Sequence, residues 1–61
     1  MRILVIEDEK KVASFIRKGL SEEMYAVDVA YDGQEGLTMA LATYYDVIIL
    51  DVMLPKKDGM T

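Results

Sequence analysis

Two short apolar runs, each followed directly by an acidic residue, constrain the fold of this chain most strongly. The first run covers residues 3 to 6, with the sequence ILVI, and the second covers residues 47 to 50, with the sequence VIIL. Continuous β-branched runs of this length are typical of strands buried on both faces, as in a parallel sheet. Glu7 and Asp51 follow the two runs. A charge at the edge of an apolar core is costly unless something compensates it, so both acids need an explanation.

Most of the chain between the two apolar runs has the sequence pattern of helices. Apolar residues recur at spacings of three and four over residues 9 to 22, which predicts an amphipathic helix. Its expected apolar stripe consists of Val12, Ala13, Phe15, Ile16 and Leu20. A second helix is predicted over residues 33 to 43, with Asp32 as its N-cap and Glu35 completing a pattern like a capping box. Its expected apolar stripe consists of Leu37, Ala40 and Leu41.

The elements alternate in a way that predicts an α/β fold. Residues 25 to 30 mix apolar and polar side chains, which indicates a strand near the edge of a sheet. The resulting order β-α-β-α-β is typical of right-handed crossovers in a parallel sheet with helices on its faces. We therefore expect half of a flavodoxin-like doubly wound parallel sheet with strand order 2-1-3. In this order the first and third strands are neighbours.

The composition leaves carboxylates as the groups able to do chemistry. The 61 residues, 52% apolar and 30% charged, fit one small globular unit at most. Because the chain has neither cysteine nor histidine, thiolate and imidazole metal sites and histidine bases are excluded. A net charge of −4 argues against direct contact with nucleic acid or an anionic membrane. No segment is long and apolar enough for a signal peptide or a membrane span, which favours a cytoplasmic location.

Three acids are expected to meet at one rim of the sheet. Glu7 and Asp8 follow the first strand, and Asp51 follows the third. The carboxyl ends of parallel strands line the crevice in which such folds bind ligands. Carboxylate oxygens, completed by water and a substrate phosphate, are typical ligands of magnesium. For each acid alone, a solvated residue at a strand end is the simpler interpretation, but the three together favour a Mg²⁺ site.

Two longer segments resemble the receiver domains of two-component response regulators. The segments are ILVIEDE at residues 3 to 9 and DVIILDVMLPKKDGM at residues 46 to 60. The resemblance implies that Asp51 is the phosphoacceptor and takes a phosphoryl group from a sensor histidine kinase with the help of Mg²⁺. The haloacid dehalogenase phosphatases also place an aspartate after a strand, but they require a second aspartate where Met53 stands in this chain.

The same resemblance implies a role for each residue around the metal. Asp8 corresponds to a direct ligand, Glu7 to a ligand acting through water, and Met53 to the residue that offers its backbone carbonyl. The methionine at this position is most similar to the class of transcription factors that carry a winged-helix DNA-binding domain after the receiver. A receiver assists its own phosphorylation, so we expect no turnover enzyme.

Receiver domains have five strands, whereas this sequence accounts for three. We therefore expect residues 1 to 61 to be the N-terminal half of a receiver domain, truncated after the third strand. The apolar outer edge of residues 47 to 50 would then be bare, and bare strand edges pair with other chains. This predicts a homo-oligomer joined through the third-strand edge. It also leaves an alternative function open, a self-associating structural fragment without phosphotransfer activity.

Overall fold

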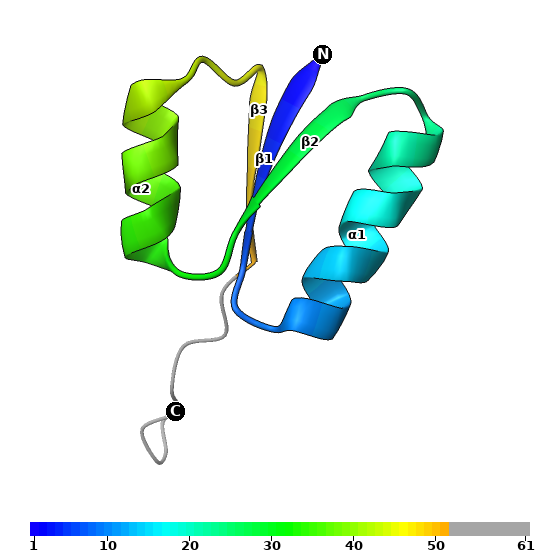
Figure 1. Cartoon of the computed structure of the whole chain (residues 1–61), viewed down its shortest axis with the longest axis horizontal. Helices are drawn as coiled ribbons and strands as arrows, with labels where there is room; N and C mark the ends of the chain where they lie inside the picture. The colour runs from blue at the N-terminus through cyan, green and yellow to red at the C-terminus, as the bar shows by residue number, and fades with distance from the viewer. Residues whose placement is uncertain (52–61) are drawn as a thin grey trace.

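The computed structural model describes residues 1–51 of the chain (Figure 1). Five elements follow one another in the predicted order: β1 (Arg2–Glu7), α1 (Lys10–Glu22), β2 (Ala26–Ala30), α2 (Gly33–Ala42) and β3 (Val47–Asp51). Each begins and ends close to the residues expected from the sequence. The β-α-β-α-β prediction is therefore confirmed.

The three strands form one parallel sheet in the order β2-β1-β3, which confirms the expected topology. Figure 1 shows α1 and α2 on opposite sides of this sheet. Both helices pack against β1 and β2, and neither packs against β3 within residues 1–51. The first strand is thus central, and β2 lies at an edge, as its mixed sequence predicted.

β1 supplies most of the core because it is covered from both sides. Leu4 and Val5 are completely buried. Successive side chains of a strand point to opposite faces, so Leu4 and Ile6 share one face. They pack there with Ala30 and with Met39, Ala40 and Tyr45 from α2 and the segment after it. Ile3, Val5 and Glu7 lie on the other face, which is covered by α1.

α2 approaches the sheet closely at Gly36. A Cβ atom at this position would lie 2.8 Å from Cγ1 of Ile6, well inside van der Waals contact. Gly36 is the buried residue of α2, and Ile6 is 7% exposed on the central strand. The absence of a side chain at this one position therefore allows the helix to rest directly on β1.

The predicted cap at the start of α2 is confirmed. Asp32 is the N-cap, and its Oδ1 accepts a hydrogen bond of 2.7 Å from the backbone N–H of Glu35. Oε1 of Glu35 accepts a hydrogen bond from the backbone N–H of Tyr31, one residue before the cap. The reciprocal bond of a capping box is therefore displaced by one residue, and it holds the end of β2 to the first turn of α2.

Four residues assigned to the apolar stripes are exposed, so the prediction was wrong about them. Val12 and Phe15 of α1 are 39% and 79% exposed, and Leu37 and Leu41 of α2 are 54% and 80% exposed. Ala13 is the buried residue of α1, and Phe15 lies two residues, or roughly 200°, around the helix from it. Among the strands that the structure describes, α1 packs against β1 and β2 and not against β3, so its apolar stripe is narrower than the sequence suggested.

A network of charged and aromatic residues ties the strands together at the amino ends. The Arg2 guanidinium lies 3.1 Å from Oδ2 of Asp28 and 5.8 Å from the centre of the Tyr45 ring. The Tyr45 hydroxyl donates a 2.7 Å hydrogen bond to the same Asp28 oxygen. This hydrogen bond and the charge of Arg2 hold the pKa of Asp28 below its ordinary value. The network fixes β1 to β2 at the rim opposite the acids.

Candidate functional site

The acids meet because of the strand order and the register of the sheet. β1 and β3 are parallel neighbours, and Glu7 lies directly beside Asp51 in their register. Residues paired in this way point to the same face of a sheet. In Figure 1 this position is the end of the sheet at which β1 leads into α1. We refer to Glu7, Asp8 and Asp51 as the acidic rim.

Glu7 is the buried member of the acidic rim. Its side chain is 4% exposed. Oε2 accepts a hydrogen bond of 2.9 Å from the backbone N–H of Glu9, whereas Oε1 is buried and has no hydrogen-bond partner among residues 1–51. The Glu9 amide lowers the pKa of the Glu7 carboxyl, but burial, the adjacent side chain of Asp51 and the charge of Asp8 together outweigh this effect. The pKa of Glu7 therefore lies above its ordinary value.

The other two members of the rim are accessible. Asp51 is exposed at the end of β3, and Asp8 is exposed in the connection between β1 and α1. Their charges both act on Glu7, as its raised pKa reflects. Among residues 1–51, no group of three acidic side chains forms a complete set that could hold a metal ion. The structure thus brings Glu7 and Asp51 together and leaves Asp8 exposed beside them. Met53 lies outside the described residues.

The donor set fits a hard divalent cation. Mg²⁺ prefers oxygen ligands, is bound through one or two carboxylates and retains several waters, so a complete protein cage is not required. An unpaired carboxylate oxygen with further negative charges beside it is costly when buried. Oε1 of Glu7 is such an atom. A cation at the acidic rim would remove this cost, and for this reason the residues present fit magnesium.

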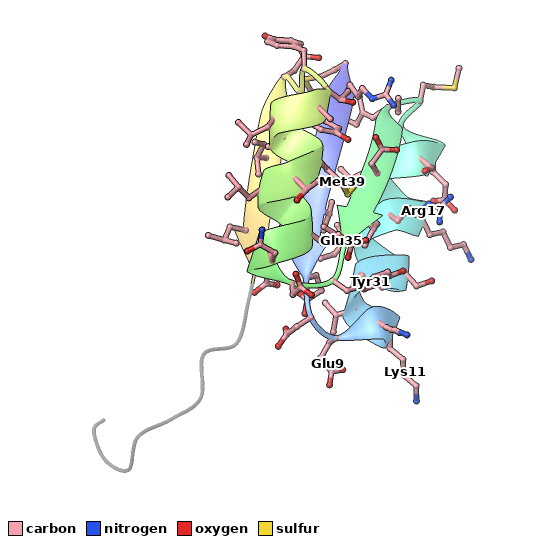
Figure 2. The ribbon with its side chains drawn as sticks, turned by 60° about the vertical axis from the view of Figure 1, so that its left-hand side comes forward. Glu9, Lys11, Arg17, Tyr31, Glu35 and Met39 are labelled. Atoms are coloured by element: carbon pink, nitrogen blue, oxygen red, sulfur yellow. The ribbon has the colours of Figure 1, made fainter. Side chains whose placement is uncertain are left out.

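Two features near the rim were not foreseen from the sequence. The first is a contact of Lys10, the first residue of α1, whose Nζ lies 5.5 Å from the centre of the Tyr31 ring. Figure 2 shows Tyr31 and Glu35 at the same end of the molecule as Glu9. The second feature is the Glu9 backbone amide, which holds Glu7. Residue types could not have signalled this contact, because every residue but proline has such an amide.

Comparisons with known proteins show which family this sequence resembles. The profile of the family described as "Response regulator receiver domain" matches residues 3–61. The chain is 48% identical over 61 residues to the transcriptional regulatory protein DltR of Streptococcus agalactiae, covering 100% of this chain and 27% of that protein. It is 52% identical over 59 residues to the response regulator ArlR of Staphylococcus aureus, covering 97% of this chain and 27% of that protein.

The chain therefore spans about a quarter of the length of these relatives. No helix within residues 1–51 has the length and apolar character needed to cross a membrane. The match to the family covers β3 and all of β1 except Arg2, and it includes the three residues of the acidic rim.

Proposed function

The chain belongs to the family of response regulator receiver domains, and from this premise we propose that it is the phosphoacceptor part of a two-component response regulator. Asp51 would receive a phosphoryl group from the phosphohistidine of a partner sensor histidine kinase. The observation that carries the proposal is the register of β1 and β3, which sets the exposed carboxylate of Asp51 beside the buried carboxylate of Glu7.

We assign the role of nucleophile to Asp51. Its carboxylate is exposed at the end of β3, so a donor can approach it. A carboxylate oxygen would attack the phosphorus, the bond from phosphorus to the donor nitrogen would break, and an acyl phosphate would form on Asp51. Phosphoryl transfer depends mostly on positioning and on neutralising charge on the phosphoryl oxygens, which Mg²⁺ supplies when bound.

The remaining residues of the rim would hold the cation. We assign direct contact to Asp8 and Asp51, contact through water to Glu7, and a backbone carbonyl contact to Met53. This assignment is supported by the hard oxygen donors and by the unpaired Oε1 of Glu7. In a longer protein of the kind that the relatives represent, phosphorylation would control DNA binding and transcription. This segment, with its net charge of −4, would not contact nucleic acid itself.

The proposal predicts phosphorylation that depends on magnesium. Incubation with acetyl phosphate and Mg²⁺ should add the mass of one phosphoryl group, which hydroxylamine should remove because acyl phosphates are labile. Addition of a chelator should prevent the increase, since nothing then neutralises the acidic rim. Intact-mass spectrometry measures both results. An unchanged mass, or an increase that persists with the chelator, would contradict the proposal.

A second candidate function, self-association, is favoured by the exposure of β3. Within residues 1–51, β3 pairs with β1 alone, and Ile48 and Leu50 are 48% and 70% exposed. Antiparallel pairing of two β3 strands about a two-fold axis centred on Ile49 would set Ile48 of one copy opposite Leu50 of the other. Both residues lie on the face of α2, so the contact would join apolar surfaces.

This second candidate predicts a dimer at micromolar concentration. Sedimentation equilibrium should report twice the mass of one chain, and Ile48→Lys should return it to a monomer because a charge would then oppose Leu50. Phe15→Lys is the matched control, since Phe15 is exposed on α1 and no contact of α1 with β3 is present in residues 1–51. A folded monomer of the unchanged chain would rule out this mode of association.

A further inference from the structure

The connection between β1 and α1 is short, and the side chain of Glu7 forms a hydrogen bond across it. Only Asp8 and Glu9 separate the two elements. Glu9 is the N-cap of α1, and its own side chain makes no capping hydrogen bond. Its backbone amide instead donates to Oε2 of Glu7 over 2.9 Å. This hydrogen bond closes a small ring around Asp8, so the backbone position of Asp8 depends on Glu7.

The position of Glu7 at the start of α1 is also electrostatically favourable. The first amides of a helix lack partners within the helix and carry partial positive charge. A carboxylate that accepts from the N-cap amide uses this charge. The favourable contact involves only Oε2, because Oε1 is buried without a hydrogen-bond partner in the described chain. Glu7 therefore has one oxygen committed to the helix and one that remains for another group.

The two carboxylate oxygens of Glu7 have different roles in the inference that follows from these contacts. We propose that Glu7 is a positioning residue that links cation binding at the acidic rim to the first turn of α1. Oε2 holds the Glu9 amide and thereby places Asp8, and Oε1 is the atom that a bound cation or its water compensates. The inference rests on the proposed function, because it concerns the same Mg²⁺ site. It adds that α1 begins in a better ordered turn when the site is filled.

Amide hydrogen exchange and magnesium titration of the full chain test this link together. We expect Mg²⁺ to bind saturably and to slow exchange of the Glu9 amide. Glu7→Gln should keep the basal protection of Glu9, because the amide oxygen of glutamine can still accept this hydrogen bond. The same variant should bind Mg²⁺ about 10 to 100 times more weakly, the usual cost of removing a supporting group. It should also lose the magnesium-dependent protection of Glu9.

Glu35→Gln is the matched control. Glu35 also accepts a backbone N–H at the start of a helix, in this case from Tyr31 beside α2. Glu35 lies outside the acidic rim, and within residues 1–51 its side chain has only this structural role. Glu35→Gln should therefore leave both the magnesium affinity and the protection of the Glu9 amide unchanged. Glu7→Ala, which cannot accept the hydrogen bond, should lose the basal protection of Glu9, and circular dichroism will show whether this variant is folded.

The outcomes separate this inference from the proposed function. Saturable magnesium binding that leaves Glu9 exchange unchanged would overturn the link and leave the phosphoacceptor role intact. Equal magnesium affinity of Glu7→Gln and the unchanged chain would overturn it as well. If the unchanged chain binds no Mg²⁺ at all, the proposed function fails, and the link fails with it.

Discussion

Asp51→Asn is expected to leave the chain without measurable phosphorylation by acetyl phosphate and Mg²⁺. An amide oxygen is a poor nucleophile compared with a carboxylate, so the acceptor itself is lost. The fold should survive, because Asp51 is exposed at the end of β3 and its replacement removes a negative charge beside the buried Glu7. Intact-mass spectrometry measures the phosphorylation, and circular dichroism confirms that the variant is folded.

Asp32→Asn provides the matched control for this loss. Asp32 also follows a strand that ends at this rim, where it caps α2 through Oδ1. Asparagine caps helices about as well as aspartate, so this variant should be phosphorylated like the unchanged chain. Phosphorylation of Asp51→Asn at the normal level would show that another residue is the acceptor. An equal loss of phosphorylation in both variants would show that the total negative charge at this end of the sheet, and not Asp51 in particular, governs the reaction.

The parts of the fold that were predictable depend on local patterns. The apolar run of β1 and the N-cap residue Asp32 are signals carried by a few adjacent residues. Such signals place an element and its start with little dependence on the rest of the chain. The strand order followed from the alternation of strands and helices, because few topologies satisfy the rules for parallel connections. Neighbouring strands that end in acids could therefore be expected from the sequence.

The width of the buried helix faces was not predictable in this way. Ala13 and Phe15 both fit an apolar stripe on α1, but Ala13 is buried and Phe15 is 79% exposed. The difference depends on which strands the helix covers, and this is a property of the assembled layers. Leu37 and Leu41 of α2 are exposed for a similar reason, because no contact joins α2 to β3 in the described residues.

The acidic rim was also predictable only in part. The meeting of Glu7 with Asp51 was expected from topology, and the register of β1 and β3 places them side by side. The burial of Glu7 and its hydrogen bond to the Glu9 amide were not expected, because they depend on the path of a connection of two residues. Metal coordination by the rim stays a prediction, as does the contribution of Met53.

Gly36→Val is expected to unfold the chain under conditions in which Gly19→Val remains folded. A Cβ at Gly36 would lie 2.8 Å from Cγ1 and 3.3 Å from Cγ2 of Ile6, whereas a Cβ at Gly19 would meet nothing within 4 Å. Ile6 cannot move aside easily, since it is 7% exposed on the central strand. Forcing extra groups into a packed core costs roughly 3 kcal/mol, which is a large share of the stability of a small domain.

Gly19→Val isolates the packing effect from the change in helix propensity. Both glycines lie in helices, and valine is a somewhat better helix former than glycine, by a few tenths of a kcal/mol. Gly19→Val should therefore unfold at the same urea concentration as the unchanged chain or a slightly higher one, whereas Gly36→Val should lack a cooperative transition. Circular dichroism during a urea titration measures both. If the two variants unfolded at the same concentration, the close approach of α2 to β1 at Ile6 would be wrong. The same result would contradict the inference that this contact with α2 helps to hold the central strand, and with it Glu7, in position.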